Sequence, residues 1–130
     1  MKKTMRLLTI SVLSWLAVLT PSVFAAEVNF ELKSLLATIR RVQSDGQGNP
    51  EAAHAWQQLV KSDSNELTTI LAALDGAGPL AANWLRSAVD TIAERTLADG
   101  KKLPAHQLEQ FALNTKHNAR VRRLAYEWLV

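Results

Sequence analysis

The sequence predicts an all-α protein whose antiparallel helix pairs stack as a short solenoid or a small helical bundle. Three observations favour this class. Apolar residues recur at helical spacing along most of the chain after residue 28. Each of the three prolines beyond residue 25 stands where a helix should begin, at Pro50, Pro79 and Pro104. No stretch alternates polar and apolar residues as a half-buried strand would.

The apolar stripes place the helices in order. We expect a first helix over 29–43, one pair within 50–75, a second pair within 79–114, and a last helix from 119 that has no partner. The stripes consist of Leu32, Leu35, Leu36 and Ile39; Ala52, Trp56, Leu59 and Val60; Leu67, Ile70, Leu71 and Leu74; Ala81, Trp84, Leu85, Ala88, Val89, Ile92 and Ala93; Leu108, Phe111 and Ala112; and Val121, Leu124, Ala125, Trp128 and Leu129.

Local signals mark the ends of these helices. Gly76 and Gly100 fall just past apolar runs, where a left-handed helix stop favours glycine. Asp63 and Glu66 have the spacing of a capping box. Short connections make sequential helices antiparallel neighbours. The stretch SDGQGNP at 44–50 is the expected hinge, which separates the first helix from the paired ones.

The first 25 residues have the three-part layout of a secretory signal. Lys2, Lys3 and Arg6 form a basic start, 7–19 are mostly apolar, and small residues end the segment. The apolar run is shorter than the roughly 20 residues that a membrane span needs, so we expect cleavage after Ala25 rather than an uncleaved anchor. This predicts export to the periplasm or the medium, with membrane contact only through the signal.

The charge balance depends on that assignment. The chain has 15 Lys plus Arg and 12 Asp plus Glu, but three basic residues lie in the signal, which leaves 12 against 12. A neutral mature chain lacks the basic footprint that nucleic acids require, so no nucleic-acid partner is expected. The absence of cysteine excludes a disulfide framework and a thiol nucleophile, so packing alone must stabilise the roughly 105 mature residues.

A turn, a short first helix and a Leu-rich second helix recur along the chain. The pattern lies in NPEAAHAWQQLVKSDSNELTTILAALDGAGPLAANWLRSAVDTIAE and again in HNARVRRLAYEWL. In this pattern the chain resembles the HEAT-like α-solenoids of exported bacterial proteins, with 49–130 as the repeat region and 26–48 as an N-terminal helix and linker. The resemblance implies a scaffold for protein–protein interaction, without catalytic residues or cofactors.

The last apolar stripe is still running where the sequence stops, with Trp128 and Leu129 within three residues of its end. One hypothesis is that the chain is the leading piece of a longer solenoid, whose next repeat would cover this face. The alternative is that the last helix folds back onto the helix at 29–43 and closes a small bundle. An uncovered terminal face would favour self-association.

Arg120, Arg122 and Arg123 are the strongest candidates for a functional role. They stand in the opening turns of a helix, where partial positive charge makes cations mildly unfavourable. Together with Lys116 and His117 they predict contact with an acidic partner or an anionic lipid surface. The alternative is that these side chains are simply solvated. In that case Arg123 pairs with Glu127 one turn further on, and the aliphatic stems of the arginines cover apolar neighbours.

Two other motifs have simpler structural interpretations. The GAGPLA stretch at 76–81 fits a dinucleotide fingerprint, but the segment before it has helical rather than strand periodicity, so no cofactor is expected. Glu51 and His54 have E-x-x-H spacing, yet a di-iron site needs that motif twice. With His106 and His117 they are expected to be solvated polar residues, and no metal site is predicted.

Three tryptophans, Trp56, Trp84 and Trp128, fall on the apolar stripes, which favours core packing over a role as interface anchors. Arg86 and Asp90 stand one turn apart and are expected to pair. Together these patterns predict an exported helical scaffold that binds an unknown protein partner and is not an enzyme. The alternative is an accessory helical segment of a larger exported enzyme or carbohydrate-processing protein. A membrane-surface helical protein is a third class.

Overall fold

The computed structural model of the chain describes residues 21–130, and in this part every regular element is a helix. The elements are α1 (Pro21–Arg40), α2 (Asn49–Leu59), a 3-10 turn η1 (Ser64–Glu66), α3 (Leu67–Ala73), α4 (Pro79–Ala98), α5 (Ala105–Leu113) and α6 (Ala119–Glu127). The predicted all-α class is therefore confirmed. The predicted signal falls largely on residues 1–20, which lie outside the described residues.

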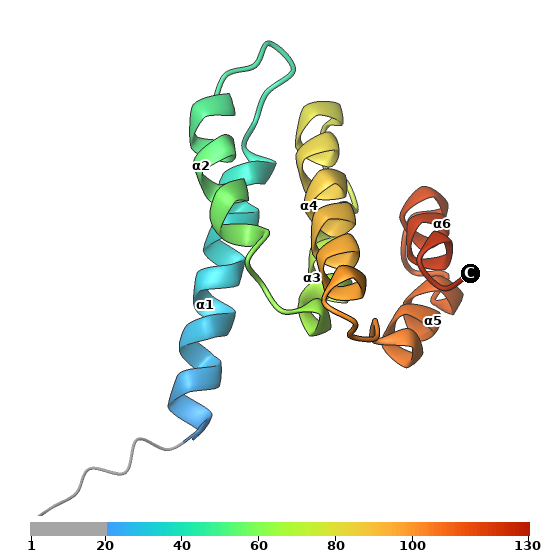
Figure 1. Cartoon of the computed structure of the whole chain (residues 1–130). Coiled ribbons are helices and arrows are strands. Elements are labelled where there is room, and N and C mark those ends of the chain that lie inside the picture. Colours follow the sequence, from blue (N-terminus) through green and yellow to red (C-terminus); the bar gives the residue numbers. More distant parts are fainter. Residues whose placement is uncertain (1–20) are drawn as a thin grey trace, which may run out of the picture.

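Three helix pairs follow one another across the molecule (Figure 1). α1 packs on α2, α3 on α4, and α5 on α6. One layer contains α1, α3 and α5, because α3 contacts both of the others. The second layer contains α2, α4 and α6, of which α2 and α4 touch each other. The arrangement is compatible with a helical repeat, since each pair contacts its neighbours along the row.

The predicted grouping of the helices was wrong by one helix. We expected pairs within 50–75 and 79–114, but α1 is the partner of α2, and α6 is the partner of α5. The stretch 44–50, expected as a hinge, instead joins the two helices of the first pair. It is held by a hydrogen bond from the Gln43 N–H to the Gln47 carbonyl at 3.0 Å, and by one from the Gln47 N–H to the Asp45 carboxylate at 3.0 Å.

Proline and glycine set the helix ends as predicted. Pro50 and Pro79 lie in the first turns of α2 and α4, where an N–H has no helical partner. Gly76 and Gly100 follow α3 and α4 with φ of 68° and 72°, a left-handed conformation that glycine adopts without steric cost. Asp63 caps η1 by accepting the Asn65 N–H at 2.9 Å.

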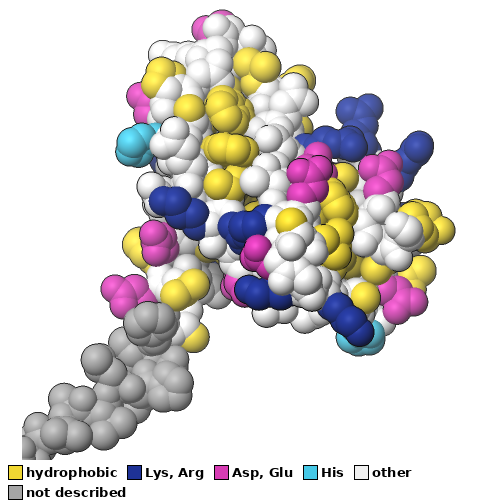
Figure 2. Space-filling model, viewed as in Figure 1, with side chains coloured by type: hydrophobic (Ala, Val, Ile, Leu, Met, Phe, Trp, Pro, Cys, Tyr) yellow, Lys and Arg dark blue, Asp and Glu magenta, His cyan; other side chains and the backbone are white. Residues whose placement is uncertain are grey.

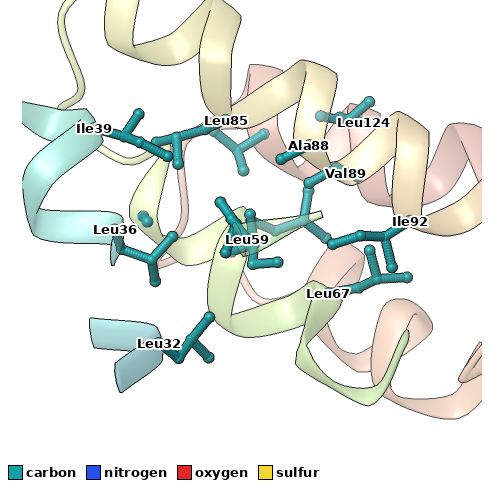
Figure 3. Close-up of a cluster of buried hydrophobic side chains, with 14 of the residues drawn as sticks. Leu32, Leu36, Ile39, Leu59, Leu67, Leu85, Ala88, Val89, Ile92 and Leu124 are labelled. Atoms are coloured by element: carbon teal, nitrogen blue, oxygen red, sulfur yellow. The ribbon is translucent and has the colours of Figure 1, made fainter. Parts of the chain in front are cut away.

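The core is centred on α4, which contacts α1, α2 and α3. Figure 3 shows apolar side chains of α1, α2, α3 and α6 gathered around the labelled side chains of α4. The predicted α4 stripe is confirmed except at Trp84, which is half-buried. The buried residues of α4 are Ala81, Leu85, Ala88, Val89, Ile92, Ala93 and Thr96. The Thr96 hydroxyl donates to the Ile92 carbonyl at 2.7 Å, so this buried polar group is satisfied.

Trp56, Trp84 and Trp128 pack against the core but stay partly exposed. Trp56 of α2 lies against Trp84 of α4 with ring centroids 6.3 Å apart and planes tilted by 57°, a favourable aromatic geometry. The Trp84 N–H donates to the Asn49 side-chain oxygen at 3.1 Å. Core packing, the predicted role, therefore holds for part of each ring rather than for the whole side chain.

The last helix does not close a bundle with the first. Val121, Leu124 and Ala125 of α6 are buried, and α6 packs on α5 and α3 without contacting α1. Trp128 and Leu129 are half-buried against the core. Most of the final apolar stripe is thus covered by the preceding helices. Within residues 21–130, no helix combines the length and apolar character that crossing a membrane requires.

We predict that Leu85→Ala lowers the free energy of unfolding by about 2 to 5 kcal/mol, because Leu85 is fully buried at the centre of the core. Trp84→Ala should cost less than the roughly 3 to 5 kcal/mol of a fully buried tryptophan, since part of the indole is exposed. Urea unfolding followed by circular dichroism measures both. Leu97→Ala on the same helix is the control, because Leu97 is 50% exposed. Equal costs for Leu85 and Leu97 would contradict the core assignment.

Candidate interaction groove

A groove of about 570 Å³ lies between α4 and α6. These two helices belong to the same layer, but their backbones do not come close to each other, whereas those of α2 and α4 of that layer do. The groove is lined by Leu74, Gly76, Ala77, Pro79, Ala82, Asn83, Arg86, Asn118, Arg120, Val121 and Leu124. The second layer is open at this groove, and residues of the turn between α3 and α4 form its floor.

The two helices run in the same direction along the groove. Residues from the start of both, such as Pro79 and Arg120, line it together. Near the end of α6, the Arg86 guanidinium lies 3.3 Å from the Glu127 carboxylate, and the Trp128 N–H donates to the Asp90 carboxylate at 3.1 Å. The groove is therefore open where both helices begin and bridged by polar contacts where α6 ends.

The bridging contacts form a chain of alternating charges at the surface. Arg123 pairs with Glu127 at 3.2 Å, Glu127 with Arg86 at 3.3 Å, and Arg86 with Asp90 at 3.8 Å. Both predicted pairs one turn apart, Arg86 with Asp90 and Arg123 with Glu127, are present. Figure 2 shows basic and acidic side chains side by side at the upper right, around α4 and α6. The charge of Arg123 is thus compensated within the protein.

Arg122 points away from the groove. Its guanidinium Nε donates to the Ala112 carbonyl near the end of α5 at 2.7 Å, and the residue is half-buried. This bond satisfies one of the carbonyls that the end of a helix leaves without a partner. Arg122 therefore ties α6 to α5, while its predicted contact with an outside partner stays a prediction.

His117 also has a structural position. Its ring stacks on Phe111 with centroids 4.0 Å apart, and its Nδ1 lies 2.6 Å from the Asp75 carboxylate. The other oxygen of Asp75 accepts the Asn118 N–H at 2.9 Å. Asp75 follows α3 and Asn118 caps α6, so this contact joins the second and third pairs beneath the groove. His117 was predicted to contact a partner, whereas the structure gives it a partner inside the chain.

The surroundings of Asp75 change its acidity. Desolvation by burial raises the pKa of Asp75, but the hydrogen bond from Asn118, the contacts with His117 and the charge of Arg40 together outweigh it. The pKa is therefore lowered from its ordinary value of 3.8. The ionised carboxylate is the form that the fold stabilises.

Arg120 and Lys116 are the two candidates that face solvent without an ion-pair partner among the described residues. Both are exposed, and within residues 25–130 no carboxylate lies within 4.0 Å of either side-chain charge. Arg120 lines the groove and Lys116 does not. The backbone N–H of Arg120 donates to the Asn118 side chain at 2.9 Å, so Asn118 caps α6. Of the five predicted residues, the structure brings only Arg120 to the groove.

The remaining motifs lie apart from one another. The GAGPLA stretch forms the turn between α3 and α4, and a helix rather than a strand precedes it. Glu51 and His54 are exposed on α2, and His106 is exposed on α5. Among the described residues no group of three or more histidines and carboxylates is placed to hold a metal ion.

Sequence reasoning missed three residues that shape the site. Asp75 holds the junction beneath the groove, Asn83 lines it, and Arg86 lines it while compensating acids of two helices. Only the spacing of Arg86 and Asp90 gave a signal, and it indicated a pair within one helix.

Comparisons of the chain with protein-family models, curated proteins and solved structures found no match.

We predict that Asp75→Asn lowers the free energy of unfolding by about 1 to 2 kcal/mol at pH 6, because an amide does not reproduce the two contacts of the carboxylate. The folded pKa of Asp75 is lower than the unfolded one, so its contribution is present above pH 3.8 and is lost as the pH falls through the folded value. The difference between the variant and the parent should therefore shrink below about pH 4.

Chemical unfolding at a series of pH values between pH 6 and about pH 2.5 measures this difference. Asp99→Asn is the control, since Asp99 is exposed after the end of α4. A constant difference across the series would show that the carboxylate charge at Asp75 does not stabilise the fold.

Proposed function

We propose that this protein is an exported, non-catalytic scaffold of HEAT-like helix pairs that binds a partner protein, with the groove between α4 and α6 as its binding surface. The observation that carries the proposal is the groove between α4 and α6, where the second layer is open. Stacked pairs normally bury their side faces on each other and use the outer surface of a layer for binding. Here α2 and α4 touch, while α4 and α6 leave a space of about 570 Å³.

The composition of the groove supports this role. Leu74, Ala77 and Ala82 supply partly exposed apolar surface, while Asn83 and Arg120 place polar and charged groups at exposed positions beside it. Binding sites commonly combine an apolar floor with a few polar groups that fix orientation. The volume suits a short segment of chain rather than a folded domain, so the partner would contribute a loop, a terminus or a single helix.

The walls of the groove are held in place from both sides. The Trp84 N–H bonds to Asn49 and thereby ties α4 to the start of α2, while Arg86 reaches Glu127 of α6. A surface fixed in this way loses little conformational entropy on binding, which favours recognition by a preformed groove.

The test is photo-crosslinking in the cells that produce the protein. A benzoylphenylalanine side chain replaces Asn83, an exposed residue of the groove, and in a control it replaces Lys33, an exposed residue of α1. We expect a discrete light-dependent adduct with one exported protein from position 83 and none from position 33. The proposal fails if position 83 gives no protein adduct, or if both positions give the same adducts.

A further inference from the structure

The charge of the groove has one sign. Its lining contains Arg86 and Arg120 and no carboxylate. This local excess stands out because the chain after residue 25 carries equal numbers of basic and acidic residues. A groove with positive charge and apolar surface is complementary to a segment that offers carboxylates beside an apolar side chain.

Arg120 is the charge available to such a segment. Its side chain is exposed at the open end, and within residues 25–130 it has no carboxylate at ion-pair distance. The guanidinium can take a carboxylate in a bidentate pair, which is shorter and stronger than a neutral hydrogen bond. Neither Arg122 nor Arg123 lines the groove: the first binds the Ala112 carbonyl and the second, on the exposed surface, pairs with Glu127.

Arg86 has a different role at the bridged end. It lies 3.3 Å from Glu127 and 3.8 Å from Asp90, so it compensates two carboxylates that would otherwise repel an acidic segment. Removal of Arg86 would leave these acids beside the groove. Arg86 thus keeps the groove accessible to negative charge, whereas Arg120 supplies the contact itself.

We propose that the groove binds a short acidic segment of the partner protein, with a carboxylate on Arg120 and a neighbouring apolar side chain on Leu74, Ala77 and Ala82. This inference rests on the proposed function and names the chemistry of the partner. An anionic membrane fits less well, because lipid recognition draws on clusters of four to eight basic residues, roughly, at the surface. A nucleic acid fits less well, because the neutral chain lacks a basic footprint.

The test is a binding titration of the protein purified from producing cells. The probe is a fluorescein-labelled peptide, Gly-Glu-Leu-Glu-Glu-Gly, followed by fluorescence anisotropy. Two matched peptides replace either the three glutamates by glutamine or the leucine by serine. We expect saturable binding of the first peptide, weakening with added salt, and at least fivefold weaker binding of both matched peptides, roughly as for the loss of one charge-assisted contact.

Substitutions in the protein locate the contact. Arg120→Gln and Arg86→Gln should each weaken binding by about fivefold or more, and Asn83→Glu, which places a negative charge in the groove, by about tenfold or more. Arg41→Gln removes the same charge at an exposed site on the first pair and should leave binding unchanged. Circular dichroism checks that each variant retains its helices.

Three results would overturn the inference. These are equal binding of the glutamine peptide, an equal effect of Arg41→Gln and Arg120→Gln, or Arg120-dependent binding to phosphatidylglycerol vesicles in the absence of peptide binding. A protein adduct at position 83 without peptide binding would leave the proposed function standing and refute the acidic preference. Peptide binding without an adduct would refute the proposed function while the chemistry of the groove held.

Discussion

The fold depends on the burial of one helix. α4 presents buried residues to α1, α2 and α3, and its central residues Leu85, Val89 and Ile92 have no exposed surface. A helix that is apolar over so much of its circumference is stable only when neighbours cover it. The first pair and α3 are therefore arranged around α4, and the third pair is attached mainly through α3.

The polar residues of α4 also bind the ends of two neighbouring helices. Arg95 donates to the carbonyls of Val60 and Ser62 after α2, where a helix end leaves acceptors unsatisfied. On the other side, Arg86 and Asp90 reach the end of α6 through Glu127 and Trp128. α4 is thus tied to α2 closely and to α6 only at one end, and this asymmetry leaves the groove open.

Local features of this fold were predictable and long-range ones were not. Pro79 and Gly76 act on their own backbone, so the sequence indicated where α3 ends and α4 begins. The pairing was missed because every connection is short, and length alone does not tell which of two neighbouring helices a third one covers. Arg120 and Arg122 differ by two positions, about 200° around a helix, so they face opposite sides. Which side faces the groove depends on contacts with α5 that lie ten residues or more away.

The attachment of the third pair has a consequence for local unfolding. α5 and α6 contact each other extensively but meet the rest of the chain mainly through α3, the Asp75 junction and the polar contacts to α4. In stacked helix pairs, stability is divided between the units and their interfaces, so a weakly attached unit opens first. Amide hydrogen exchange in α5 and α6 should then report a smaller opening free energy than in α4. The groove lies between α4 and α6, where the third pair would separate from the rest of the chain. A bound segment that contacts both helices would therefore also slow amide exchange throughout the third pair.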